Sequence, residues 1–311
     1  MEGELGVALI GYGHWGPNLA RSLDRVPSAA LRAVCVRTAA AAAAVAAQRP
    51  DVEATTDLDG LLERPDVDVV AVATPAPAHS ELARRALLAG KHVLVEKPLA
   101  TSLPAAEELT ALAFAAGRTL MVGHVYVYHP VVRRLAELLW AGDLGELASV
   151  ASARANTTGT PKDGSVLWNL APHDLSIVVY LLGATTRRVS ARGSDERMSL
   201  AVELASGVRV EIELSWIAPA KTRRMTFTGS AAVAVFDELA VMPLEVIARS
   251  DGGAGARLDI APAPAGDPLR AQWEELVAAL REGREPVTGA RHALAVQRLL
   301  DAADRSLTRA R

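Results

Sequence analysis

Short apolar runs separated by longer helix-like segments fill the first 124 residues. The runs lie at 5–10, 31–36, 67–74, 92–96 and 119–124, and each is nearly unbroken rather than alternating with polar residues. Unbroken apolar strands are typical of a parallel sheet that is covered on both faces, and the intervening segments have the length of crossover helices. Residues 1–124 are therefore predicted to form an α/β domain built on a doubly wound parallel sheet.

The pattern changes after residue 124. Helices are predicted at 131–142 and within 168–183, with a long strand between them at 146–156. Several strands joined by turns follow between 187 and 239, and they are expected to be largely antiparallel. A loop rich in Gly, Pro and Ala at 251–267 then precedes two C-terminal helices. Residues 125–311 are therefore predicted to form an α+β domain with an open, mostly antiparallel sheet.

The segment directly after the first apolar run reads GYGHWG and matches the pattern GxGxxG. Its glycines are Gly11, Gly13 and Gly16, with His14 and Trp15 between them. Glycines at this spacing between a strand and a helix allow the backbone to approach a pyrophosphate at the helix N-terminus. The position predicts the phosphate loop of a Rossmann domain, and the alternative is a glycine-rich turn with no ligand.

The end of the second apolar run bears on which dinucleotide is bound. An acid is expected about 20 residues beyond the last glycine. Here Arg37 and Thr38 occupy that region, and the next acid after them is Asp51. A carboxylate there would bind a free 2′-hydroxyl and repel a 2′-phosphate, so its absence beside Arg37 favours NADP(H) over NAD(H). The alternative is that Arg37 is solvated or covers the adenine of NAD.

Lys97 is unusual because this chain prefers arginine. It contains 33 Lys plus Arg, of which only four are lysines (Lys91, Lys97, Lys162 and Lys221). Lys97 ends the apolar run 92–96 and precedes Pro98, which forces the chain out of the strand. The carboxyl ends of parallel strands form the ligand-binding edge of an open α/β sheet. The position predicts a functional amine, and the alternative is a solvated surface lysine.

A second candidate lies in the segment WNLAPHDL at 168–175. His173 follows Pro172 at what the sequence suggests is the start of a helix, where Asp174 suits the helix dipole. A histidine exchanges protons near neutral pH, although a lone histidine there is more often structural. His, Asp, Glu and the single Cys35 do not gather at metal-ligand spacing, so no metal is predicted.

The overall composition excludes several classes of protein. The chain has 311 residues, a formal net charge of −3 and no basic stripe, which argues against nucleic acid or an anionic membrane as its main partner. Neither a positively charged signal-peptide region nor an unbroken apolar span of about 18 residues occurs. One cysteine permits no disulfide within the chain, and a reducing cytoplasm is the expected location.

The segments GYGHWGPN, ATPAPAH, AGKHVLVEKPLA and LWNLAPHDLSI, in this order, resemble the glucose–fructose oxidoreductase / inositol dehydrogenase (Gfo/Idh/MocA) family. The resemblance implies hydride transfer between a nicotinamide and a carbinol carbon of a sugar, nucleotide sugar or cyclitol. It implies that Lys97 is the lysine of the family's EKP motif and that His173 is its catalytic histidine. It also implies cofactor contacts from Thr74, Pro75, His79 and Glu96.

One residue departs from the family pattern, and the substrate is expected from the family branch. Many members carry an aspartate four residues before the histidine, where this chain has Asn169, which cannot accept a proton. The sequence looks most like the branch of nucleotide-sugar 3-dehydrogenases. Arg154, Asn156 and Lys162 lie on a segment that could reach a diphosphate, and the alternative is an exposed cluster at a strand end. Trp168 is expected to contact the substrate.

Two alternatives to this function remain open from the sequence. One is the same chemistry on inositol or a free sugar, and the other is a nicotinamide-binding sensor or scaffold with little turnover. The family's open sheet often mediates oligomerisation, so a homodimer or homotetramer is expected.

Overall fold

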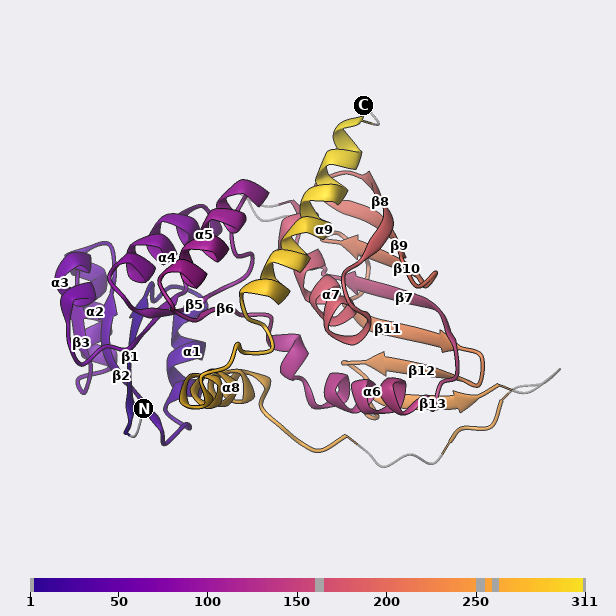
Figure 1. The fold of residues 1–311 in the computed structure, drawn as a ribbon, viewed down its shortest axis with the longest axis horizontal. Coiled ribbons are helices and arrows are strands. Elements are labelled where there is room, and N and C mark those ends of the chain that lie inside the picture. The colour runs from indigo at the N-terminus through magenta and orange to yellow at the C-terminus, as the bar shows by residue number, and fades with distance from the viewer. Residues whose placement is uncertain (1–2, 160–164, 250–254, 259–262, 310–311) are drawn as a thin grey trace. The chain divides into compact units, whose positions relative to one another are not determined.

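The computed structural model describes residues 3–159, 165–249, 255–258 and 263–309, and the chain divides into two compact units (Figure 1). The first unit comprises Met1–Val125 and Asp267–Gln297, and the second comprises Tyr126–Gly266 and Arg298–Arg311. Each unit is described by itself.

The first unit is built on a six-stranded parallel sheet with strand order β3-β2-β1-β4-β5-β6. The strands are β1 Leu5–Ile10, β2 Ala29–Cys35, β3 Glu53–Thr55, β4 Val69–Val72, β5 His92–Val95 and β6 Leu120–Val122. The connecting helices are α1 Gly16–Leu23, α2 Ala39–Gln48, α3 Leu58–Glu63, η1 Ala76–Ala78, α4 His79–Leu88 and α5 Leu103–Ala115. This order, which reverses between β1 and β4, confirms the predicted doubly wound sheet.

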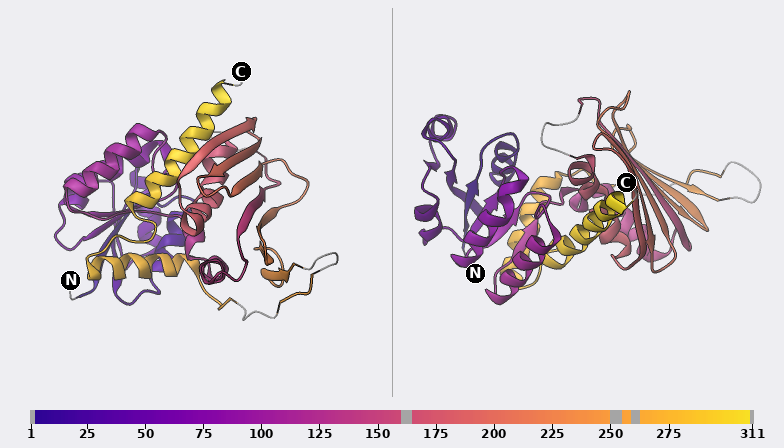
Figure 2. Two further views of the ribbon diagram at one scale, coloured as in Figure 1. Left: turned by 45° about the vertical axis from the view of Figure 1, so that its right-hand side comes forward. Right: turned by 90° about the horizontal axis from the view of Figure 1, so that it is seen from above.

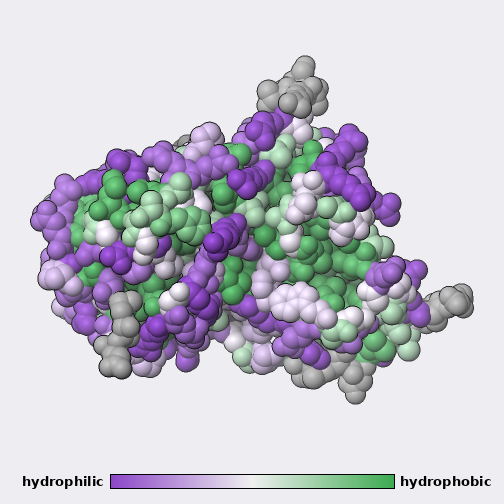
Figure 3. All heavy atoms as spheres, in the orientation of Figure 1, coloured by the Kyte–Doolittle hydropathy of each residue, from purple (hydrophilic) through white to green (hydrophobic). Residues whose placement is uncertain are grey.

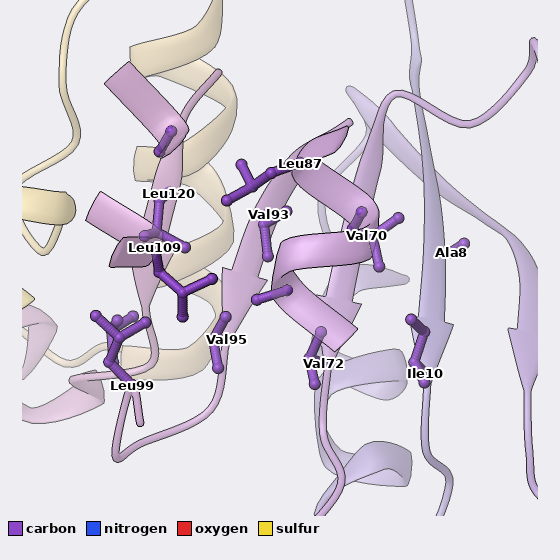
Figure 4. Packing of buried hydrophobic residues seen from close by; sticks show 14 of the residues in the cluster. Ala8, Ile10, Val70, Val72, Leu87, Val93, Val95, Leu99, Leu109 and Leu120 are labelled. Atoms are coloured by element: carbon purple, nitrogen blue, oxygen red, sulfur yellow. The ribbon is translucent and has the colours of Figure 1, made fainter. Parts of the chain in front are cut away.

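The core of this unit follows from the unbroken apolar strands. Figure 4 shows side chains of β1, β4 and β5, among them Ile10, Val70 and Val93, packed with residues of α4 and α5 such as Leu87 and Leu109. Burying both faces of the central strands fixes the sheet and leaves its polar groups at the strand ends. The functional residues of this unit therefore lie at those ends.

Two elements of this unit were not predicted from the sequence. Strand β3 has only three residues, none of them buried, so it carries no apolar run to mark it. Helix α3 is also short, and its first turn is fixed by the side chain of Asp57, which accepts a hydrogen bond from the Gly60 amide at 3.0 Å.

The C-terminal segment divides the chain differently from the predicted boundary at residue 124/125. Helix α8, Pro268–Glu282, packs on α1, and the indole of its buried Trp273 donates to the Leu19 carbonyl at 3.2 Å. The Thr288 hydroxyl donates to the carbonyl of Val122 on β6 at 2.9 Å. Residues 267–297 thus belong with the first unit, because their apolar side chains complete its core. The last helix, α9 Ala290–Arg309, begins in the first unit and ends in the second.

The second unit contains a seven-stranded sheet with order β13-β12-β11-β7-β10-β9-β8, antiparallel except for the β7–β10 pair. Its strands are β7 Leu147–Ala155, β8 Thr186–Gly193, β9 Arg197–Leu204, β10 Arg209–Ser215, β11 Thr222–Gly229, β12 Ala232–Asp237 and β13 Leu244–Ala248. Its helical elements are η2 Val125–Tyr128, α6 Pro130–Ala141 and α7 Val166–Leu182. The mostly antiparallel sheet confirms the prediction, although β13 was missed. The predicted loop 251–267 lies partly outside the described residues.

The two faces of this sheet differ in polarity. Along β10 the residues Val210, Ile212 and Leu214 are buried, whereas Glu211 and Glu213 between them are exposed. Helices α6 and α7 pack against strands of this sheet from the apolar side, as Figure 2 shows. In Figure 3, hydrophilic residues are prominent along α9. The alternation of buried and exposed residues along β10 is the pattern of a sheet with one covered face and one open face.

Candidate active site

The phosphate loop of the first unit is shaped by two close backbone approaches. Gly11 has φ +95°, a conformation that side chains disfavour, and its amide donates to the Cys35 carbonyl at 2.9 Å. A Cβ at Gly16 would lie 2.4 Å from the Gly11 carbonyl oxygen, so only glycine fits there. These contacts bring the ends of β1 and β2 and the start of α1 together.

The space above this loop fits a pyrophosphate. A Cβ at Gly13 would meet no atom within 4 Å, and His14 beside it is exposed. Helix α1 starts after Trp15 without a side-chain cap; Pro17 has no amide proton and the Asn18 amide donates to the Trp15 carbonyl at 2.9 Å, so the amide that this first turn offers to a ligand is that of Gly16. Free amides at a helix N-terminus are what a bound phosphate requires. The residues present therefore fit a dinucleotide.

A hydrogen bond links the phosphate loop to the EKP segment. The Trp15 indole nitrogen donates to Glu96 Oε1 at 2.6 Å, across 81 positions of sequence. Burial raises the pKa of Glu96 to about 7, although Lys97 and the indole both favour its ionised form. Trp15 and Glu96 thus contact each other, as expected of residues around one cofactor.

Lys97 lies just beyond β5, which ends at Val95 as the sequence predicted. Its side chain is half-buried, and the Lys97–Pro98 peptide bond is cis. The positive charge of Lys97 helps to lower the pKa of His124, where burial is the larger cause. His124 is itself buried after β6, with its ring centroid 5.3 Å from that of His292. The lysine therefore sits at the carboxyl edge of the sheet among groups that respond to its charge.

His79 has a different task from the predicted cofactor contact. It is 1% exposed, and its two ring nitrogens lie 2.7 Å from the Pro98 carbonyl and 2.8 Å from the Thr74 carbonyl. Because both nitrogens are engaged with the main chain, His79 fixes the loops after β4 and β5 and offers no nitrogen to a ligand. Pro75, the residue after Thr74, is exposed.

The region after β2 contains an exposed cation. Arg37 is exposed, and the next residue, Thr38, caps α2 by accepting from the Ala41 amide at 3.2 Å. An acid that the sequence did not suggest, Asp57, lies close enough to influence the pKa of Cys35 at the end of β2. Its carboxylate caps α3, however, so it serves the fold.

In the second unit, helix α7 carries the predicted histidine on its exposed side. The helix begins at Val166 with Ser165 as its cap, so His173 lies within the helix and not at its start. The prediction of a start at Pro172 was wrong because Pro172 lies inside the helix, where it removes one backbone hydrogen bond and crowds the carbonyl four residues earlier without ending the helix. Asn169 and His173 are four residues apart and share one face, with Trp168 also half-buried beside Asn169.

Tyr126 connects His173 to the rest of this unit. The Tyr126 and His173 rings meet edge to face, with centroids 5.0 Å apart. The Tyr126 hydroxyl donates to Glu238 Oε2 at 2.8 Å, and the Arg154 guanidinium lies 4.4 Å from the centre of the tyrosine ring. His173 therefore packs against the Tyr126 ring, whose hydroxyl is bonded to Glu238 and whose face is covered by Arg154.

Arg154 is committed to a buried ion pair. Its Nε and Nη2 donate to the two carboxylate oxygens of Asp174, both at 2.9 Å, and the two residues are 3% and 1% exposed. Burial alone would lower the pKa of Arg154, but Asp174 raises it above the ordinary value. The expectation that Arg154 reaches a diphosphate needs correction, since its charge is already neutralised. The expectation that Asp174 serves the helix dipole needs the same correction.

Asn156 is paired with a cation that the sequence analysis did not single out. Its Oδ1 accepts from Arg223 Nη2 at 2.5 Å. Arg223 is half-buried on β11 and lies directly opposite Arg154 on β7. The third predicted contact, Lys162, lies outside the described residues. Tyr126 and Arg223 are therefore residues near His173 and Arg154 that the sequence did not reveal, because their partners are distant in sequence.

Neither a metal centre nor a membrane-spanning helix is found among the described residues. In the described parts of the chain, no group of three or more His, Cys, Asp or Glu side chains is arranged to hold a metal ion. Within the same ranges, none of the helices combines the length and apolarity needed to cross a bilayer.

Comparisons with known proteins agree with this arrangement. Residues 5–124 match the family described as "Oxidoreductase family, NAD-binding Rossmann fold", and residues 132–235 match the "GFO/IDH/MocA C-terminal domain". The 4-carboxy-2-hydroxymuconate-6-semialdehyde dehydrogenase of Sphingobium sp. is 28% identical over 306 residues, which cover 94% of this chain and 96% of that protein.

Two solved structures are similar along their whole length. The 3-ketoreductase KijD10 from Actinomadura kijaniata, in complex with TDP-benzene and NADP, has a TM-score of 0.84 and 27% identity over 98% of each chain. The UDP-N-acetylglucosamine 3-dehydrogenase GnnA from Acidithiobacillus ferrooxidans has a TM-score of 0.85 and 25% identity over 98% of each chain. Because the two family matches span well over half of the sequence, the protein belongs to the Gfo/Idh/MocA family of oxidoreductases, whose N-terminal domain is an NAD-binding Rossmann fold.

Proposed function

We propose that the protein transfers a hydride between NADP(H) and a ring carbinol or ketone of a nucleotide sugar, most specifically at C3. The observation that supports this most strongly is the full-length similarity to KijD10 and GnnA, two enzymes named for oxidation or reduction at position 3 of a sugar.

The cofactor half of the proposal rests on the first unit. The uncapped N-terminus of α1 and the open space at Gly13 suit the pyrophosphate, and Arg37 suits a 2′-phosphate. The nicotinamide, when bound, supplies or accepts the hydride. The Trp15–Glu96 hydrogen bond joins the phosphate loop to the segment that carries Lys97, so one bound cofactor can contact both the loop and this segment.

Lys97 and His173 are proposed to act on the reacting oxygen. Lys97 holds this oxygen and stabilises its partial negative charge, because an ammonium is a compact donor. His173 takes the hydroxyl proton in oxidation and returns it in reduction. Its ring is oriented by Tyr126, which is a positioning residue in this scheme. Asn169, on the same face of α7, orients the substrate by hydrogen bonds and transfers no proton.

A second copy of the chain is proposed to cover the open face of the seven-stranded sheet. That face presents small residues such as Ala151, Ala201 and Thr226 on both sides of the exposed Glu211, so an interface there would be partly charged. A homodimer or homotetramer is the expected assembly. Small-angle scattering that gave the mass of a monomer would contradict it.

The proposed function is tested by following absorbance at 340 nm with purified protein. NADP⁺ and NAD⁺ are offered separately against UDP- and dTDP-hexoses and inositols, with a trap for the keto product. A rise with a nucleotide sugar, larger with NADP⁺, is expected. If absorbance rises only with inositol or a free sugar, the substrate is a cyclitol or free sugar and not a nucleotide sugar. Tight NADPH binding without any turnover would support a sensor or scaffold.

A further inference from the structure

A positive charge without a carboxylate partner, Arg223, lies near Tyr126, the tyrosine that contacts His173. Arg223 and Arg154 face each other across β11 and β7, and directly opposed residues point to the same face of a sheet. Like charges in such a pair destabilise it. Asp174 compensates the charge of Arg154 by an ion pair, whereas no carboxylate of the described residues forms an ion pair with Arg223.

The contacts of Arg223 hold its guanidinium in place without neutralising it. Nη1 donates to the carbonyls of Ala155 and Thr222, both at 2.7 Å, and Nη2 donates to Asn156 Oδ1 at 2.5 Å. All three acceptors are uncharged. A guanidinium has five N–H donors, of which these bonds use three, and the uncharged Tyr126 hydroxyl is also within reach of the group.

The surroundings of Arg223 favour an anion. Burial and the neighbouring Arg154 lower the pKa of Arg223, while Tyr126 and Glu238 oppose this. Glu238 is the nearest acid with an influence, but it is exposed and its Oε2 accepts the Tyr126 hydroxyl at 2.8 Å. The charge therefore remains available to a ligand, one side chain away from the tyrosine that contacts His173.

We infer that Arg223, oriented by Asn156, binds an anionic oxygen group of the substrate and takes the role first expected of Arg154. This inference rests on the proposed function for its place beside the reacting sugar. Two ligands share the required chemistry. One is the diphosphate of a nucleotide sugar, and the other is a carboxylate, a group that the name of the Sphingobium relative contains.

The experiment measures binding by titration calorimetry with the full chain in the presence of NADP⁺. UDP is the probe for the diphosphate, and 3,4-dihydroxybenzoate is the probe for a carboxylate. The variants are Arg223→Gln, which removes the charge, and Asn156→Asp, which keeps Arg223 in place and neutralises it. Arg224→Gln is the matched control, because Arg224 is the next residue on β11 and its exposed side chain points to the other face.

The expected result is that one probe binds the wild type and binds Arg223→Gln and Asn156→Asp about 10- to 100-fold more weakly, which is the usual effect of a charge-assisted hydrogen bond. Arg224→Gln is expected to bind as the wild type does. The probe that shows this pattern identifies the source of the anion. The inference is overturned if the wild type binds neither probe, or if Arg223→Gln and Asn156→Asp bind like the control.

The 340 nm assay separates this inference from the proposed function. Binding that depends on Arg223 but is accompanied by no turnover of nucleotide sugars would keep the anion site and reject the function. Turnover of a nucleotide sugar with an unchanged KM in Arg223→Gln would keep the function and reject the anion site.

Discussion

The proposed cofactor site of the first unit and the proposed substrate site of the second unit are built by different means. In the first unit, a glycine conformation, an uncapped helix start and the ends of parallel strands form the surface, so the main chain shapes the site. In the second unit, a buried Arg154–Asp174 pair, an aromatic ring and Arg223 form it, so side chains shape the site.

This difference predicts different ways of failing. A site shaped by the main chain is damaged by added atoms, because its close approaches leave no room for a Cβ. A site shaped by buried charges is damaged by removing one partner, because the other is left without compensation in a low-dielectric setting. The four substitution experiments below test this contrast.

The largest effect is expected at Lys97, a charged side chain in the half that the main chain shapes. Lys97→Ala is expected to lower kcat by about 10²- to 10³-fold, because it removes a donor to the reacting oxygen. NADPH affinity, measured by fluorescence, should change little. Lys91→Ala is the control: its Nζ donates to the carbonyls of Arg64 and Val67, so stability should fall while turnover remains. Turnover of Lys97→Ala within about tenfold of the wild type would reject the assignment.

The buried pair of the second unit should show the cost of an uncompensated charge. Arg154→Met and Asp174→Leu are each expected to lower the free energy of unfolding by about 3–5 kcal/mol, since each leaves a buried charge alone. The double variant should recover most of this loss. Urea denaturation followed by circular dichroism measures both. Additive losses in the double variant would show that the pair is not coupled.

The same contrast explains which residues the sequence could predict. Gly11, Gly13 and Gly16 act through local backbone geometry, and the strand before Lys97 is a continuous apolar run, so spacing alone located them. Arg154 was assigned to the substrate because its partner Asp174 is 20 residues away on another element, and no local pattern reports such a pair. Arg223 was missed for the same reason, since its position opposite Arg154 depends on strand register.

The fold shows this limit as well. Strand β3 and helix α3 were not predicted, because pairing with β2 and the cap by Asp57 hold them in place rather than an apolar pattern of their own. The long β7 was predicted, but its parallel pairing with β10 was not, since pairing partners are set by the whole sheet.

Two of the three glycines of the phosphate loop, Gly13 and Gly16, allow a sharper test within one motif. Gly16→Ala is expected to lower the free energy of unfolding by about 1–3 kcal/mol, because its Cβ would overlap the Gly11 carbonyl oxygen. Gly13→Ala should leave stability unchanged, since nothing lies within 4 Å, but should weaken NADPH binding about tenfold by occupying the space for the pyrophosphate. Urea denaturation and a fluorescence titration measure the two effects. A Gly13→Ala variant with normal NADPH affinity would show that the cofactor does not approach this residue.

The smallest effect is expected at Glu96, where the main-chain-shaped half contains a buried acid. Its pKa is raised from 4.5 to about 7, chiefly by burial, so the folded protein favours the protonated form. The stability that this group contributes is complete below about pH 4.5 and is lost as the pH rises through about 7. Glu96→Gln keeps an acceptor for the Trp15 indole but cannot ionise. The melting temperature of the wild type should therefore fall relative to Glu96→Gln between pH 5 and pH 8, while the exposed Glu63→Gln, which also removes one carboxylate, should stay parallel to the wild type. A constant difference across this range would show that Glu96 ionises as easily in the folded protein as in the unfolded chain, and that its contact with Trp15 outweighs its burial.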